Sequence, residues 1–408
     1  MVKYPLLSRA LARSQFRWFY FGRTISLFGS AMTPVALAFA VLQSPGGQHL
    51  LGFVLAAEIL PHLAMLLIGG SLADRYRRDK LIQLSNIGSG ATQAGVAAVV
   101  LLHDNPLWIF PFAIANGVLG ALTSPAMRGI VPELVDPANI KQANSLLSAS
   151  RSAAKIVGPS VAGVLVATVG GGWGIALDAA SFFIASACMS PVRIPAAPIA
   201  PRTSLVAEMR EGWSYFRQRK WIWSITVTFT VLNLIQMGVW QVLGPIIAAK
   251  TFGSAGWGLA LGMKSVGLLL ASLVVLRLPI RRPLCASVLG MAPNGIPMIA
   301  LGQSSLLLYL LGSSFVAGLG QTFAGIGWDT SLQKAVPRDK LSRVMAIDEF
   351  GSYIAIPVGE MLATPLAGAF GYSAIATIGG IAFIVVSLLP LAQRQVRSTT
   401  MEQIDVLG

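Results

Sequence analysis

The stretch that decides the fold is Gly69-Gly70-Ser71-Leu72-Ala73-Asp74-Arg75-Tyr76-Arg77-Arg78-Asp79-Lys80, which lies between two long apolar runs, residues 50–68 and 81–102. Six of its last seven residues are ionic, although only 11% of the whole chain is charged. Short basic segments between apolar runs are typical of cytoplasmic turns that join two membrane helices. The stretch therefore predicts a helical hairpin in a membrane.

The composition supports a membrane protein. The chain has 408 residues, of which 54% are hydrophobic, and its mean hydropathy is +0.69. A soluble protein carries about 25% charged residues, so this chain cannot cover its surface in water. Only helices and closed barrels satisfy their backbone hydrogen bonds in lipid. The apolar runs reach the roughly 20 residues that a spanning helix needs and show no alternation, so we expect an all-α membrane protein.

Twelve spans are expected from the apolar runs and their Gly, Pro and charged punctuation. They are residues 17–42, 51–73, 81–102, 107–127, 142–168, 174–192, 221–248, 256–277, 284–302, 305–328, 344–368 and 372–392.

The basic residues predict the orientation. With both termini in the cytoplasm, all but four of the 30 basic residues lie in inward loops or at inward helix ends; the four are Arg23, Lys155, Lys250 and Lys264. This asymmetry predicts a multi-pass protein of the cell's inner (plasma) membrane. It also accounts for the formal charge of +14 without nucleic acid as a partner.

The midpoint of the chain divides it into three regions. We expect a six-helix bundle over residues 1–192, a cytoplasmic linker over 193–220 and a second six-helix bundle over 221–408. A shift of 201 residues superimposes Gly117 on Gly318 and Gly158 on Gly359, which indicates parallel repeats. In the linker, an apolar stripe predicts an amphipathic helix at the inner membrane interface, or a linker helix that merely docks on the bundle; its members are Leu205, Met209, Trp213 and Phe216.

Three motifs stand out: Gly70-x-Leu72-Ala73-Asp74-Arg75-x-x-Arg78, Gly158-Pro159-Ser160-Val161-Ala162-Gly163, and Phe16-Arg17 leading into Gly22-Arg23. They resemble motifs of the major facilitator superfamily, and within it those of the bacterial exporter group of the enterobactin exporter and macrolide efflux proteins; the second is antiporter-like. The chain departs from the family pattern at three places: Arg77 stands where glycine is usual, Asp79 where a basic residue is usual, and Ala113 where antiporters often carry arginine.

The resemblance implies two pseudo-symmetric six-helix bundles that alternate between inward and outward access. It also implies a gate in which the Gly70, Asp74, Arg75 and Arg78 loop meets the start of the eleventh helix, where Asp348 and Glu349 lie. The alternative is a solvated loop that only sets topology.

Acidic residues within the predicted spans are candidates for proton coupling, because intramembrane carboxylates are costly and face a cavity or a partner. Glu58 is followed by His62 at i+4 on the same helix face, and Asp178 and Glu360 are further candidates. A structural pair is the alternative for Glu58, and a buried hydrogen-bonding role is the alternative for Asp178. Lys264 lies at a depth in the eighth helix corresponding to that of Glu58 in the second.

The seventh span carries Asn233, Gln236 and Trp240 on one helical face, with Gln241 adjacent. Amides and an indole suit an amphipathic substrate, although hydrogen bonds between helices would use the same residues. The resemblance implies that the first, fourth, seventh and tenth helices line the cavity, and this adds Ser26, Thr33, Asn116 and Gln321. Arg23 is a candidate to contact an anionic substrate or to balance a buried acid.

These patterns predict a transporter and no enzyme. The sequence has no phosphate loop, no metal-ligand cluster and no nucleophile motif, so no cofactor is expected. We expect a monomeric secondary transporter that exports amphipathic small molecules, such as a siderophore, an antibiotic or another metabolite, by proton antiport or with another coupling ion. The alternatives are a lipid or lysolipid translocator or an importer of the same fold, and a non-transporting membrane scaffold or sensor.

Overall fold

The computed structural model describes residues 8–66, 77–194, 205–275, 277 and 280–403. Its regular elements in these ranges are all helices, as the apolar runs predict. Ten of the helical segments are long and apolar enough to cross a membrane. The second and third predicted spans are not among these ten, so the count of twelve stays a prediction. The chain forms two compact units, Met1–Ala200 and Pro201–Gly408.

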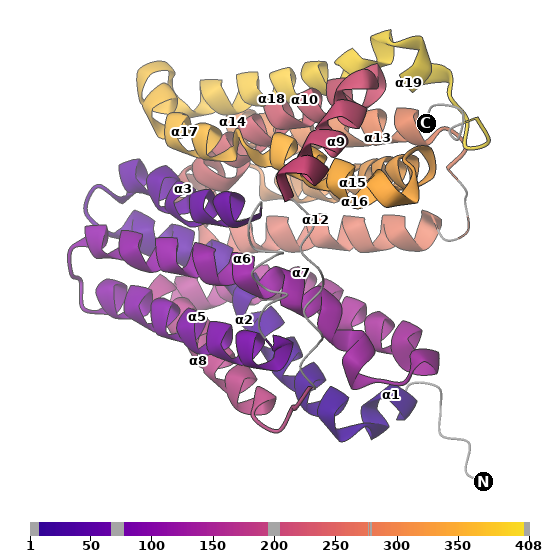
Figure 1. The fold of residues 1–408 in the computed structure, drawn as a ribbon. Coiled ribbons are helices and arrows are strands. Elements are labelled where there is room, and N and C mark those ends of the chain that lie inside the picture. Colours follow the sequence, from indigo (N-terminus) through magenta and orange to yellow (C-terminus); the bar gives the residue numbers. More distant parts are fainter. Residues whose placement is uncertain (1–7, 67–76, 195–204, 276, 278–279, 404–408) are drawn as a thin grey trace. The chain divides into compact units, whose positions relative to one another are not determined.

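The first unit is a bundle of long helices that run roughly parallel to one another (Figure 1). Its elements are α1 (Ser8–Ala12), α2 (Ser14–Gln43), α3 (Gly47–Leu66), α5 (Arg78–Leu101), η1 (Pro106–Trp108), α6 (Ile109–Leu134), η2 (Pro137–Asn139), α7 (Ile140–Val169) and α8 (Gly171–Met189). Helix α2 packs against α7 and α8, α5 packs against α6 and α8, and α3 packs against α6.

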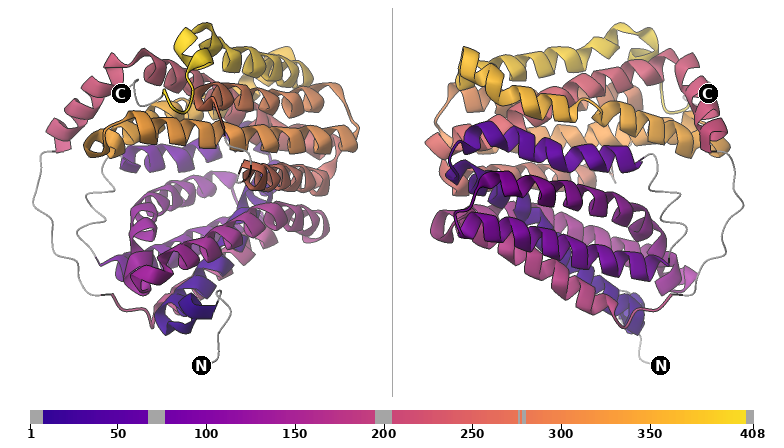
Figure 2. Two further views of the ribbon diagram at one scale, coloured as in Figure 1. Left: turned by 90° about the vertical axis from the view of Figure 1, so that its right-hand side faces the viewer. Right: turned by 60° about the vertical axis from the view of Figure 1, so that its left-hand side comes forward.

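The second unit repeats this pattern, as both views in Figure 2 show for its long helices. Its elements are α9 (Leu205–Gln218), α10 (Lys220–Ile235), η3 (Gln236–Leu243), α11 (Gly244–Thr251), α12 (Gly253–Val275), α13 (Pro283–Met291), η4 (Ala292–Asn294), α14 (Gly295–Gln303), α15 (Leu307–Ala335), α16 (Arg338–Tyr353), α17 (Ile356–Phe370), α18 (Tyr372–Leu388), η5 (Leu389–Ala392) and α19 (Arg394–Ser398). Helix α12 packs against α15 as α3 packs against α6 in the first unit.

Paired glycines give the repeat a physical basis. Helix α7 ends at Gly170 with a φ of +91°, and α17 ends at Gly371 with a φ of +92°, a left-handed region that side chains disfavour. A Cβ atom on Gly117 would clash with the carbonyl oxygen of Glu58, and a Cβ on Gly318 would clash with that of Lys264. The α3–α6 and α12–α15 crossings therefore depend on equivalent glycines.

The matching glycines place Glu58 and Lys264 at equivalent positions of the two units. Because Gly117 and Gly318 occupy matching places in the repeat, Glu58 and Lys264 are equivalent residues of the two units. The expected correspondence between the second and eighth helices is thus seen at residue level. The two repeats carry opposite charges at this position.

The long spans of the second unit are interrupted more often than the apolar pattern suggests. The seventh predicted span, residues 221–248, is α10, a π-helix at η3 and α11. The ninth contains a 3-10 turn at η4, in which Pro293 cannot donate a backbone hydrogen bond. The eleventh begins at Arg338 and breaks after Tyr353, just before Pro357. Interruptions of regular α-helix, such as a π-helix or a 3-10 segment, often occur at functional sites.

The amphipathic linker helix is present as α9, but Trp213, one residue of its expected apolar stripe, is not on the buried face. Gly212, Tyr215 and Phe216 are buried, whereas Trp213 is 54% exposed. The Tyr215 hydroxyl donates to the carbonyl oxygen of Ala335 at 3.0 Å, which turns this face of α9 toward the end of α15. Trp213 stacks on Phe216 with ring centroids 5.7 Å apart.

Candidate functional site

Glu58 lies midway along α3 and faces α6. Its Oε1 accepts a hydrogen bond of 2.9 Å from the Asn116 amide nitrogen. The Thr92 hydroxyl on α5 donates in turn to the Asn116 amide oxygen at 3.5 Å. Among the residues that the structure describes, no Lys or Arg forms an ion pair with Glu58. The three polar groups form a chain that links three helices of the first unit.

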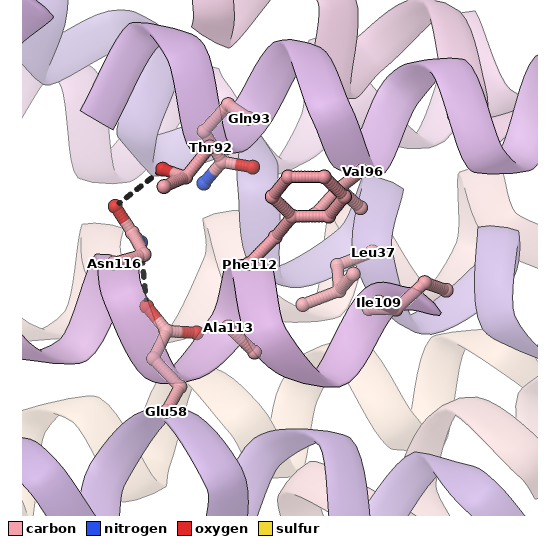
Figure 3. A pocket seen from close by; sticks show the side chains of 9 residues that line it. All are labelled: Leu37, Glu58, Thr92, Gln93, Val96, Ile109, Phe112, Ala113 and Asn116. Carbon is pink, nitrogen blue, oxygen red and sulfur yellow. Dashed lines mark hydrogen bonds between the residues drawn. The ribbon is translucent and has the colours of Figure 1, made fainter. Parts of the chain in front are cut away.

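A small cavity opens beside this chain (Figure 3). Phe112, Leu37, Ile109 and Val96 form its apolar side, and Glu58, Asn116, Thr92 and Gln93 form its polar side. Its volume is about 10 Å³, which is at the lower limit for one water molecule. The site can hold a proton or a water, and it is far too small for an amphipathic substrate.

Asp178 on α8 is another carboxyl inside this unit, and it is 1% exposed. The Thr33 hydroxyl donates to Asp178 Oδ2 at 2.6 Å. The hydroxyls of Ser30 and Ser181 donate to Oδ1 at 3.4 Å and 3.3 Å. Gly29 makes room for this contact, because a Cβ there would clash with the Asp178 and Ser181 side chains. Asp178 thus ties α8 to α2, as its hydrogen-bonding alternative expects.

The seventh-span stripe is divided between two kinds of contact. The Asn233 amide nitrogen donates to the carbonyl oxygen of Ser352 at 3.0 Å and joins α10 to α16. Trp240 lies in the π-helix, is 3% exposed and packs against Trp257 with ring centroids 4.7 Å apart. The ammonium of Lys264 lies 5.6 Å from the centroid of the Trp240 ring, within the range of a cation–π contact.

The predicted cavity residues Gln236, Gln241 and Gln321 carry side-chain amides that are partly buried. Gln236 and Gln241 both lie in the π-helix and are neither fully buried nor fully exposed. Gln321 lies on α15, one turn beyond Gly318, and its amide oxygen is buried with no hydrogen-bond partner among the described residues. Such an orphaned acceptor is rare in proteins and is available to a water or a ligand.

Asp348 is held inside the second unit. The Thr226 hydroxyl donates to its Oδ1 at 2.6 Å, and the Trp328 indole donates to its Oδ2 at 2.8 Å. The carboxyl is buried, whereas the neighbouring Glu349 is exposed. Asp348 therefore joins α16 to α10 and α15, and Glu349 is the one of the two that is accessible for a gating contact.

The charged hairpin is described from Arg77 onward; Gly70, Asp74 and Arg75 lie outside the described residues. The Arg78 guanidinium donates to the carbonyl oxygen of Gly129 at 2.9 Å and forms an ion pair with Glu133. This engages Arg78 within the first unit, at the end of α6, so its gating contact with Asp348 or Glu349 stays a prediction.

Arg77 and Asp79, the two hairpin residues that differ from the family's usual pattern, contact each other. Arg77 forms a bidentate pair with Asp79, with N–O distances of 2.8 Å and 3.2 Å. Burial would raise the pKa of Asp79, but the Arg77 hydrogen bonds, the backbone N–H groups of Lys80 and Ile194, and the Arg77 charge outweigh it and hold the pKa below its usual value. The arginine and the aspartate that replace the usual residues therefore compensate each other.

The remaining predicted residues lie on α2, α3, α7 and α17. Ser26 is buried and donates to the carbonyl oxygen of Arg23. Gly158 packs against Ala31 of α2, where a Cβ would be too close. The other members of this group are His62, partly buried on α3, Glu360, buried on α17, and Pro159 and Gly163, buried on α7.

Several residues of these sites were not among those that the sequence analysis singled out. Thr92 and Gln93 are among the buried polar residues of α5, along with Ser85, Asn86 and Ser89. A membrane helix with so many polar residues signals a polar interior, and this could have been read from the sequence. Trp257, Trp328 and Thr226 gave no such signal, because each acts through a partner that is distant in the chain.

Comparisons with known proteins agree with this architecture. A sequence model for the family of transmembrane secretion effectors matches residues 8–294. The multidrug efflux pump Tap of Mycolicibacterium fortuitum is 27% identical over 362 residues, which cover 85% of this chain and 87% of that protein. Macrolide efflux protein A of Streptococcus pyogenes is 23% identical over 380 residues, 90% of this chain and 93% of that protein.

Solved structures share the fold. The crystal structure of the peptide transporter POT in complex with sulfate superposes with a TM-score of 0.75 at 14% identity and covers 99% of both chains. At this level of identity the likeness concerns the fold alone.

Proposed function

Because this chain belongs to the transmembrane secretion effectors of the major facilitator superfamily, we propose that it exports amphipathic small molecules by proton antiport. Its relatives are efflux pumps for macrolides and multiple drugs, which supports an outward direction and an apolar cargo. The candidate cargo is an antibiotic, a siderophore or another metabolite. The protein would act as a monomer in the inner membrane, with both termini in the cytoplasm.

The observation that carries the coupling is the environment of Glu58. A carboxyl in a membrane helix is costly to keep charged, and this one has a neutral amide donor and a water-sized cavity. Such surroundings suit a group that takes up a proton from one side and releases it to the other. Asp178 is held by three hydroxyl donors and is the second candidate.

The cycle is one of alternating access between two bundles, residues 1–192 and 221–408, joined by the linker at 193–220. The hairpin with Asp74 and Arg75 would close the inner side against the start of the eleventh span, with Glu349 as the accessible acid. Glycine crossings such as those at Gly117 and Gly318 support rigid bundles, and rigid-body motion of repeats is the usual mode for such transporters.

A flux experiment tests the coupling. Purified protein in proteoliposomes is given an imposed pH gradient, and the movement of a macrolide and of fluorescent amphipathic dansyl compounds is followed. Glu58→Gln keeps an oxygen for the Asn116 hydrogen bond but cannot carry a proton. We expect this variant to bind the compounds as the wild type does and to lose flux driven by the pH gradient.

The matched control is Glu402→Gln, an exposed glutamate near the C-terminus, which should leave the flux unchanged. Undiminished pH-driven flux in Glu58→Gln would remove Glu58 from the mechanism and direct attention to Asp178. An absence of flux for every compound in the wild type would argue for the scaffold or sensor alternative.

A further inference from the structure

The membrane-spanning helices contain acids and cations whose partners differ in kind. The carboxyls of Glu58, which is partly buried, and of Asp178 and Asp348, which are buried, all accept hydrogen bonds from neutral donors, namely an amide, hydroxyls and an indole. The three ion pairs among the described residues, Arg13–Asp136, Arg77–Asp79 and Arg78–Glu133, all lie in the loops or at helix ends. None of these three pairs involves Arg23 or Lys264, two cations that lie within the predicted spans.

Lys264 is the clearest example. It lies in the middle of α12, is only partly buried, and has no carboxylate within ion-pair distance in the described part of the chain. Its contact is the face of Trp240, which Trp257 holds in place from α12. A ring face stabilises an ammonium without neutralising it. The indole positions the charge and leaves it available to an anion.

The first unit has a comparable cation in Arg23. No ion pair involves it among the described residues, and the charged neighbour that acts on it is Arg151, a like charge. On either side of Arg23 along α2, the hydroxyls of Tyr20 and Thr24 meet the Ser150 hydroxyl of α7 at 2.9 Å and 3.2 Å. Guanidinium and hydroxyl groups together are typical binding groups for an acidic moiety.

We propose that the exported molecule is acidic as well as amphipathic, and that Lys264, positioned by Trp240, binds its anionic group. This inference rests on the proposed export function and adds the charge of the substrate. A buried or half-buried cation without a counter-ion is costly in a membrane protein, and an anionic substrate would supply that counter-ion.

A series of three probes with one body and three charges tests the proposal. N-dansylglycine carries a carboxylate, its amide is neutral, and N-dansylethylenediamine carries an ammonium. Their dissociation constants are measured by dansyl fluorescence on the full-length protein in lipid nanodiscs, with protein-free nanodiscs as the blank. We expect the acid to bind about tenfold more tightly than the amide, and the amine to bind most weakly.

The variants assign the preference to Lys264. Lys264→Gln should bring the affinity for the acid down to that for the amide, whereas Lys264→Arg should keep the preference. Lys250→Gln is the matched control, because Lys250 also lies on an aromatic ring, 5.2 Å from the centroid of Tyr372, but is exposed.

Equal binding of the acid and the amide, preference for the amine, or a preference that survives in Lys264→Gln would each overturn the inference. So would the absence of specific binding for all three probes. If a pH gradient still drives export of the amide or the amine, the proposed export function stands even though the inference about an acidic substrate fails. The two can be told apart because flux is measured separately from the binding preference for the acid.

Discussion

At the scale of single residues, the hairpin shows how two unusual residues can replace a usual pattern. Arg77 and Asp79 form a bidentate pair, and Asp79 also accepts from the backbone N–H of Ile194. This anchors the start of α5 to the chain that follows α8. A residue-by-residue comparison with the family motif sees two mismatches, whereas the structure contains one interaction.

The pair predicts a coupling between its two members. Asp79→Asn should lower the free energy of unfolding by about 1 kcal/mol, Arg77→Gly should also lower it, and the double variant should lose less than the sum of the two single losses. The pKa of Asp79 is held below its usual value, so its contribution is present at neutral pH and is lost as the pH falls through that lowered pKa. Melting temperatures of wild type and Asp79→Asn should therefore differ at pH 7 and converge below about pH 4. A strictly additive double variant would show that the two side chains are independent.

The Asp348 site gives a second residue-scale prediction. Trp328→Phe keeps a smaller aromatic ring but removes the indole N–H that donates to Asp348, so a buried acceptor loses a partner. We expect a loss of about 1–3 kcal/mol in the free energy of unfolding, measured by thermal unfolding in detergent. Trp213→Phe is the control, because Trp213 is exposed on α9 and should change little. Equal melting temperatures for both variants would mean that the indole N–H is dispensable.

At the scale of helices, glycines decide how closely the elements can approach. In α15 two glycines have opposite surroundings: Gly318 touches the backbone of α12 at Lys264, while Gly312 has open space around its Cα. Because these two positions share one helix, they separate the effect of close packing from that of helix propensity.

The two glycines should respond to alanine in opposite ways. Gly318→Ala forces the α12–α15 crossing apart and should lower the free energy of unfolding by about 1–3 kcal/mol. Gly312→Ala should be neutral or stabilising by up to about 1 kcal/mol, because alanine favours a helix. Thermal unfolding of both variants, with binding of N-dansylglycine as a second readout, checks this. A stable Gly318→Ala protein would mean that the crossing tolerates a wider separation.

At the scale of the whole molecule, the asymmetry of basic residues predicts which ends of the helices face the cytoplasm. Two exposed serines of the second unit lie on sides predicted to be opposite: Ser214 on the linker helix α9 and Ser305 between α14 and α15. The prediction is best tested in a background where Cys188 and Cys285, the two cysteines, are replaced by alanine.

In intact cells a membrane-impermeant maleimide should label Ser305→Cys and spare Ser214→Cys. After the membrane is permeabilised, both variants should be labelled to a similar extent, which controls for accessibility. The reverse pattern in intact cells would invert the orientation and place the charged hairpin outside. Labelling of both before permeabilisation would contradict the expected number of crossings between them.

The sequence by itself determined the class of the protein, most of the helix positions and the two-fold repeat. These properties depend on local quantities, namely the length of apolar runs, the spacing of glycines and the distribution of basic residues, which the chain carries regardless of its fold. It also singled out Glu58, Asp178 and Lys264, because a charge in an apolar run stands out without any knowledge of its neighbours.

Only the tertiary structure decided what those residues contact. Asn116 donates to Glu58, Thr33 donates to Asp178, and the ring of Trp240 contacts Lys264. These contacts depend on which helix faces cross, and residues up to 145 positions apart meet at the crossings. Apolar periodicity cannot supply this information, because a helix buried on most sides has no distinct polar face to read. The tight glycine crossings select one register among many, and that register makes Glu58 and Lys264 equivalent.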